Sequence, residues 1–207
     1  QAPFQDIFPK VFHNEYTYHS VKAEGSDRII HVPAADDYVL IFQGRNVYLR
    51  EENGEIHIPR YAECGEMSAE LIYLFAIDDR QYFLYPPKAE PVGMEGASVS
   101  LPGYEYMKIF EIRHKQPGHR VFAAETAYHL YVWYRDNGFC GRCGQPTVPD
   151  AKERMLRCPV CGNIIHSVGN SVISCCGIPL PPLEAEVPDP DHDVAIQAVE
   201  DEHFLSF

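Results

Sequence analysis

Four cysteines of this chain stand in two Cys-x-x-Cys-Gly motifs, residues 140–144 and 158–162, with fourteen residues between the inner cysteines. Each motif can form a knuckle, a tight turn that aims two sulfur atoms at one point, and the glycine lets the backbone bend back. Two knuckles supply four thiolates in a tetrahedron, which suits Zn²⁺. Four protein ligands leave no open position. The spacing therefore predicts a structural zinc site made by Cys140, Cys143, Cys158 and Cys161.

A competing set of ligands shares one of these motifs. Cys158 and Cys161 are followed, after thirteen residues, by the adjacent pair Cys175 and Cys176. This arrangement resembles the small desulforedoxin-type module, in which such a set holds one iron. Cys158 and Cys161 cannot serve two mononuclear sites, so zinc in the first set and iron in the second exclude each other. Cys175 and Cys176 are otherwise expected to be packed strand thiols, and we expect Cys64 to be a buried or idle thiol.

The amino-acid composition limits the cellular compartments and the binding partners that we expect for this chain. The 207 residues include 17 Lys and Arg against 30 Asp and Glu, a net charge of −13 that disfavours binding to nucleic acid or to an anionic membrane. The apolar run 71–77 is far shorter than the roughly 20 residues that span a bilayer. An odd, clustered set of seven cysteines favours metal ligation in a reducing cytoplasm, and we see no leader after Gln1. Near the knuckles we expect a solvated basic rim: Arg135, Arg142, Lys152, Arg154 and Arg157.

The expected elements place the cysteines after a β-rich domain, residues 1–118. Two hairpins are predicted in it, 38–42 with 46–49 and 71–77 with 81–85, and 104–112 favours a strand. Residues 119–137 have an apolar stripe at helical spacing and predict one long helix, packed between two bodies. The fold class is α+β, with a rubredoxin-like zinc ribbon at 138–168.

The last part of the chain, 169–207, is predicted to be a short acidic β tail. Arg157 is the last basic residue, and the final fifty residues contain eight acidic ones. Residues 192–198 and 203–207 alternate apolar and polar around 200–202, a hairpin signature. Because the chain stops inside this hairpin, we expect the native chain to continue past Phe207.

The residues around the knuckles resemble a known family. Trp-Tyr-Arg-Asp-Asn-Gly-Phe at 133–139, the first knuckle, and Glu-Arg-Met-Leu-Arg-Cys-Pro-Val-Cys at 153–161 are similar to NADH pyrophosphatases of the Nudix class. The resemblance covers roughly residues 5–166 and implies a β-rich domain, a helix ending in Trp and a zinc ribbon. No Nudix box follows the pattern of that family, so no catalytic residue carries over.

The tail resembles a second family. Cys-Cys-Gly-Ile-Pro-Leu at 175–180 and Asp-His-Asp-Val-Ala-Ile at 191–196 follow the order of desulfoferrodoxin, a superoxide reductase. His192 stands near the place of a first iron ligand there. The further ligands of such a centre are not in this sequence, so we expect His192 to be a surface residue.

Together these observations predict a non-catalytic module with structural zinc, which scaffolds or docks an unidentified protein partner or forms a homodimer. One alternative is an iron redox protein of the desulfoferrodoxin type. Another is a fragment of a nucleotide pyrophosphatase whose catalytic domain is missing. If this chain is an enzyme, the resemblances imply NAD(H) diphosphatase or superoxide reductase activity.

Overall fold

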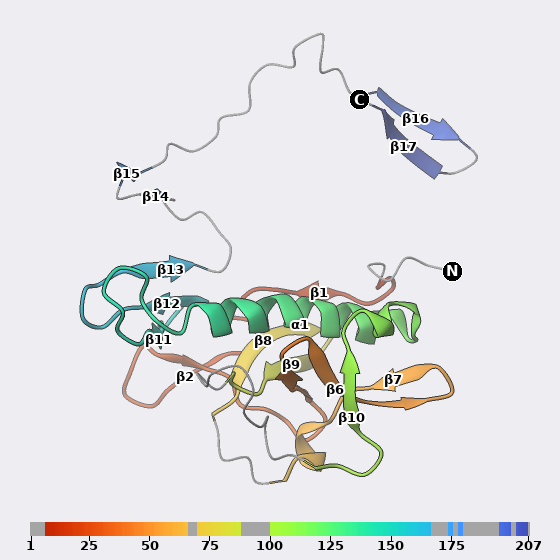
Figure 1. The fold of residues 1–207 in the computed structure, drawn as a ribbon, viewed down its shortest axis with the longest axis horizontal. Helices are drawn as coiled ribbons and strands as arrows, with labels where there is room; N and C mark the ends of the chain where they lie inside the picture. The colour runs from red at the N-terminus through yellow and green to blue at the C-terminus, as the bar shows by residue number, and fades with distance from the viewer. Residues whose placement is uncertain are drawn as a thin grey trace. The chain divides into compact units, whose positions relative to one another are not determined.

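The computed structural model describes residues 7–65, 70–87 and 100–166, and the backbone of 174–175, 178–179, 195–199 and 202–206. The chain consists of two compact units, Gln1–Ser167 and Val168–Phe207. The first unit contains most of the strands and one α-helix (Figure 1). Its elements are β1 (Phe12–His13), β2 (Val21–Lys22), β3 (Ile29–Ile30), β4 (Tyr38–Leu40), β5 (Phe42–Gln43), β6 (Asn46–Glu52), β7 (Glu55–His57), η1 (Tyr61–Glu63), β8 (Ile72–Ile77), β9 (Arg80–Leu84), β10 (Glu105–Lys108), η2 (Glu111–His114), α1 (Gly118–Asp136), β11 (Val148–Pro149), β12 (Met155–Arg157) and β13 (Ile164–His166).

The first sheet has the strand order β1-β8-β9-β4. Strands β8 and β9 form the hairpin predicted at 71–85, with a register shift between Tyr73 and Phe75. The sequence predicted that residues 38–42 form a hairpin with residues 46–49. For residues 38–40 this prediction is wrong. Strand β4 instead runs parallel to β9, with Tyr38 opposite Tyr82, because its apolar residues are buried on both faces of the sheet.

The second sheet has the order β10-β6-β5, with β7 also paired to β6. Its β5–β6 hairpin keeps the second half of the predicted pairing, Phe42 opposite Val47. The strand expected over 104–112 is confirmed only for β10. After it the chain enters the 3₁₀ helix η2, which buries Ile112 completely.

Helix α1 begins one residue before the predicted start and ends one residue before the predicted end. Alanines on its buried face allow the sheets to approach closely, and larger residues fill the space towards its C-terminal end. These side chains share one core cluster with both sheets and with Leu156 of β12. Figure 1 shows the ribbon strands beside the C-terminal end of α1. The buried helix residues are Val121, Ala123, Ala124, Ala127, Tyr131 and Tyr134.

The second unit, from Val168, contains two strand pairs. Strands β14 (Ser174–Cys175) and β15 (Ile178–Pro179) are antiparallel. Strands β16 (Ala195–Val199) and β17 (Glu202–Ser206) form the hairpin that the alternating pattern predicted. The observed fold class is therefore mixed α+β. Within the described residues, no helix has the length and apolar character needed to cross a membrane.

Candidate metal centre

The four predicted cysteines lie together at one end of the ribbon. Their Sγ atoms all lie within 4.8 Å of one another. Across the two knuckles, Cys140 Sγ is 3.6 Å from Cys161 Sγ, and Cys143 Sγ is 3.4 Å from Cys158 Sγ. Among the residues the structure describes, this is the one group of three or more metal-ligating side chains brought so close.

The two knuckles have the same backbone hydrogen bonds. Cys140 N–H donates to the Gln145 carbonyl at 2.7 Å, and Cys158 N–H donates to the Asn163 carbonyl at 2.8 Å. In each, the glycine four residues after the first cysteine donates back to that cysteine's carbonyl. Gly144 and Gly162 have φ of 74° and 72°, a left-handed conformation that a side chain would strain. Local turn chemistry therefore sets the direction of all four sulfur atoms.

The sulfur spacing fits a tetrahedral ion. Zinc–sulfur bonds of about 2.3 Å in a tetrahedron place sulfur atoms about 3.8 Å apart, close to the two distances above. Cys140 and Cys158 are buried, Cys161 is half-buried and Cys143 is exposed. The group therefore has a protein side and a solvent side, from which an ion can enter.

The pKa values of three of the thiols differ because each thiol interacts with its neighbours. Against the effect of desolvation, the backbone N–H groups of Arg142 and Cys143 lower the pKa of Cys140 to about 6. The backbone N–H of Cys161 lowers the pKa of Cys158. Although the Gln145 N–H opposes it, the neighbouring Cys158 raises the pKa of Cys143 to about 12. Without a cation the group resists full ionisation, and a divalent cation removes that resistance.

Other residues that the sequence singled out lie elsewhere. Cys64 is half-buried against a small core of Val39, Ile41 and Tyr48, and burial raises the pKa of its thiol to about 11. The side chains of Cys175, Cys176 and His192 lie outside the described residues, so the iron arrangement remains a prediction.

The ribbon is joined to α1 by a short, hydrogen-bonded connection. Asn137 N–H and Nδ2 both donate to the Trp133 carbonyl and close the helix end. Thr147, just before β11, donates its hydroxyl to the Asn137 carbonyl at 2.7 Å. Three antiparallel strands follow in the order β11-β12-β13. The connection therefore fixes where the ribbon begins relative to the helix.

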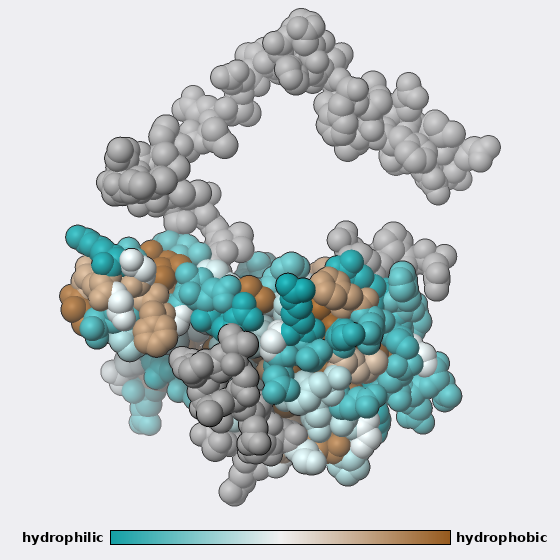
Figure 2. Space-filling model, in the orientation of Figure 1, coloured by the Kyte–Doolittle hydropathy of each residue, from teal (hydrophilic) through white to brown (hydrophobic). Residues whose placement is uncertain are grey.

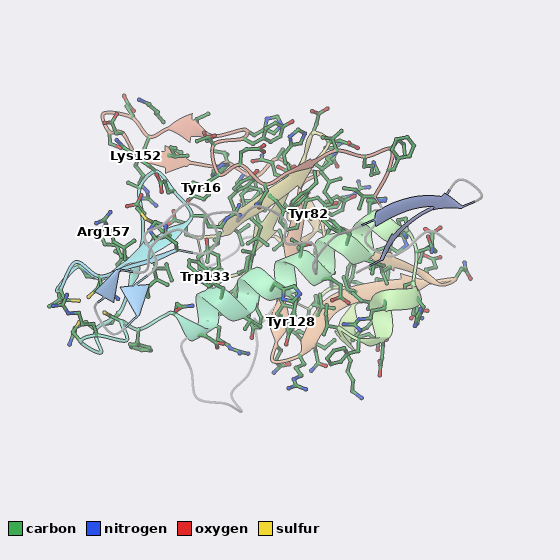
Figure 3. All side chains as sticks on the ribbon, turned by 90° about the horizontal axis from the view of Figure 1, so that it is seen from above. Tyr16, Tyr82, Tyr128, Trp133, Lys152 and Arg157 are labelled. Atoms are coloured by element: carbon green, nitrogen blue, oxygen red, sulfur yellow. The ribbon has the colours of Figure 1, made fainter. Side chains whose placement is uncertain are left out.

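Arg154 anchors the ribbon to the first sheet, a role that its place among basic rim residues did not suggest. Its guanidinium donates to the Leu74 carbonyl of β8 and, at 2.8 Å, to Asn14 Oδ1, and lies 5.9 Å from the centre of the Tyr16 ring. Close by, the Ile29 N–H donates to the Ala151 carbonyl at 2.8 Å. Figure 3 places Tyr16 near the ribbon loop that holds Lys152. The expectation of a solvated rim is wrong for Arg154, because its guanidinium is hydrogen-bonded to Asn14 and Leu74, which the fold brings to it from more than 70 residues away in sequence.

Beside this anchor, Tyr73 offers a first test of the packing. It is 3% exposed, and its hydroxyl has no hydrogen-bond partner among the described residues. Burial raises its pKa. Since the ring alone does the packing, we expect Tyr73→Phe to keep or raise the free energy of unfolding, by up to about 1 kcal/mol. Urea unfolding measures the change. A loss of stability would mean that the hydroxyl has a partner. A matched control is Tyr48→Phe, because the Tyr48 hydroxyl accepts from Leu101 N–H at 2.9 Å.

His31, stacked on Tyr73, predicts a pH dependence. Burial lowers the pKa of His31 from 6.5 to about 4, against the backbone hydrogen bonds of Tyr16 and Tyr18. Between these pH values the His31 imidazole is protonated in the unfolded chain and neutral in the folded chain. The free energy of unfolding should therefore fall as pH falls through this window. His31→Phe keeps a ring at the stack, and its stability should fall less steeply over the same range. Parallel slopes for both proteins in urea unfolding would contradict the assignment.

One family comparison bears on this site. Residues 135–165 match the family model of the NADH pyrophosphatase zinc ribbon domain. The match contains all four clustered cysteines and confirms the predicted resemblance for this segment. No curated protein matches the chain. The resemblance of the N-terminal part to the same family, and of the tail to desulfoferrodoxin, stays a prediction.

Proposed function

We propose that Cys140, Cys143, Cys158 and Cys161 bind one structural Zn²⁺, and that the chain is a non-catalytic scaffolding or docking module built around it. The convergence of four sulfur atoms within 4.8 Å carries this proposal. The match of residues 135–165 to a zinc ribbon family supports zinc over other ions. Four thiolates fill the tetrahedral coordination sphere of zinc and leave no position for water or substrate.

The contacts around the ribbon support a scaffolding role. Leu156 is 4% exposed and packs in the main core, and Arg154 reaches the first sheet from the same hairpin. A folded ribbon therefore holds α1 and the sheets in one arrangement. Because four uncompensated thiolates repel, this arrangement should depend on the metal.

Exposed apolar side chains on the ribbon support a docking role. Large apolar residues are normally buried, and a group of exposed ones is typical of an interaction surface. Figure 2 shows tan and brown surface over the ribbon strands. The partner we propose is a second protein or a second copy of this chain. The residues are Phe139, Val148, Val160 and Ile164, with exposures of 56, 44, 69 and 41%.

Metal analysis of the purified chain tests the proposal. We expect one zinc per chain and a colourless protein. Iron bound by four thiolates gives a red protein, and finding it would support the alternative set Cys158, Cys161, Cys175 and Cys176. Metal-free protein with a folded ribbon would contradict both arrangements.

An NADH hydrolysis assay with Mg²⁺ tests the non-catalytic part of the proposal. The zinc ribbon match is the observation that favours the alternative, a fragment of a nucleotide pyrophosphatase. We expect no turnover above the blank. Turnover that persists through purification to homogeneity would overturn the non-catalytic role. It would not bear on the proposal that the four cysteines bind zinc. The expected cytoplasmic location stays a prediction.

A further inference from the structure

A cavity of about 760 Å³, partly open to solvent, lies where three segments of the first unit meet. One wall is formed by residues 29–31 of β3 and its continuation, and another by residues 71–73 at the start of β8. The third is formed by residues 148–151 of the ribbon. Protein pockets that bind small molecules typically measure about 300–1,000 Å³. The size of this cavity suits such a ligand.

Aromatic rings line much of the cavity, and they are already packed. The rings of His31 and Tyr73 stack with centres 3.7 Å apart and planes 2° from parallel. Tyr16 meets His31 edge-on, with centres 5.3 Å apart. Tyr61 and Tyr134 line the cavity too. Since these rings hold one another in place, binding would cost little ordering of the wall. Such a wall favours a flat aromatic molecule, which gains from offset and edge contacts between rings.

The charged groups of the lining are paired with one another or with close neighbours. Arg28 lies 3.0 Å from Glu70, and Asp150 lies 3.1 Å from Arg157 and also accepts two backbone hydrogen bonds. Burial keeps His31 neutral, with a pKa of about 4. A charged ligand would find no unpaired charge among these groups and would lose part of its hydration on entering, which is costly. The lining therefore favours a neutral ligand.

We propose that this cavity binds a small, neutral, planar aromatic molecule of one or two rings. Because one wall belongs to the ribbon, the proposal rests on the ribbon being folded, and not on which metal it holds. It adds a ligand site to a chain whose proposed role is otherwise structural.

Indole and two charged relatives test the ligand class on the 207-residue chain. Amide chemical shifts in ¹H–¹⁵N spectra are followed during titration with indole, indole-3-acetate and tryptamine, and zinc content is measured in the same samples. We expect saturable shifts with indole in the three wall segments, and affinities at least about tenfold lower for the anion and the cation. Equal binding of either ion would overturn the neutral class. Shifts elsewhere, or no saturation up to about 1 mM, would overturn the site.

Variants that fill the cavity test its position. Ile30→Trp and Leu71→Trp place a large ring on two of its walls, and each should weaken indole binding by at least about tenfold. Val11→Trp is the control, because Val11 is 54% exposed and does not line the cavity. It should leave the affinity unchanged. Unchanged affinity in both cavity variants would overturn the proposal. A sample that loses zinc but still binds indole would contradict the structural role proposed for the metal. It would leave the proposed ligand site intact.

Discussion

Cys143→Ser is expected to abolish stoichiometric metal binding and to unfold the ribbon, residues 138–166. Structural zinc contributes roughly 10–16 kcal/mol in zinc-finger peptides at neutral pH, so losing one of four thiolates removes most of what holds the knuckles together. Cys143 is the best position for this test because its side chain is exposed, and serine at this position disturbs no packing. It also belongs to the zinc set and not to the iron set, so the outcome separates the two.

Metal content and amide hydrogen exchange measure this result. Exchange protection should be lost from the knuckles and β11–β13 while β6 and β9 keep theirs. Chelation of the metal from the unaltered chain should give the same pattern. Cys64→Ser is the control, since the Cys64 thiol donates to the Arg60 carbonyl at 3.3 Å and does not belong to the cysteine cluster. If Cys143→Ser retained its metal and Cys176→Ser lost it, the ligand set would be the iron arrangement.

Local patterns of the sequence predicted the grouping of the four cysteines well, because the information lies within each motif. A knuckle is built from hydrogen bonds between residues at most five positions apart, as in the pair from Cys140 to Gln145. The helix and the β8–β9 hairpin are equally local and were also predicted. Each of these elements carries its own signal, in residue spacing, apolar period or turn residues.

Non-local pairing was the part that the sequence could not predict. Strand β4 leaves its neighbour in the chain and pairs in parallel with β9, more than 40 residues on. Nothing in an apolar run such as 38–42 states which strand it will join. Arg154 presents the same difficulty: beside other basic residues in a cysteine-rich hairpin, it looks like a solvated charge. Only the fold brings Leu74 and Asn14 to its guanidinium.

Arg154→Met should therefore be among the most damaging substitutions outside the cysteines. Hydrogen bonds to charged groups contribute roughly 1.5–3 kcal/mol each, and the change would also leave the buried Leu74 carbonyl without this donor. We expect a loss of about 2–4 kcal/mol in the free energy of unfolding, measured in urea. Met keeps much of the length of the side chain, so lost packing contributes little to the change.

Arg142→Met is the matched control, because Arg142 is exposed in the first knuckle, and its loss should change stability by less than about 0.5 kcal/mol. Equal effects of the two substitutions would show that Arg154 is a rim residue after all. Hydrogen exchange adds a readout that stability alone lacks. If Arg154 fixes the ribbon on the first sheet, its loss should weaken protection in β8 and in the ribbon hairpin together, while the zinc content stays the same. The metal would then set the fold of the ribbon, and the arginine its position on the sheet.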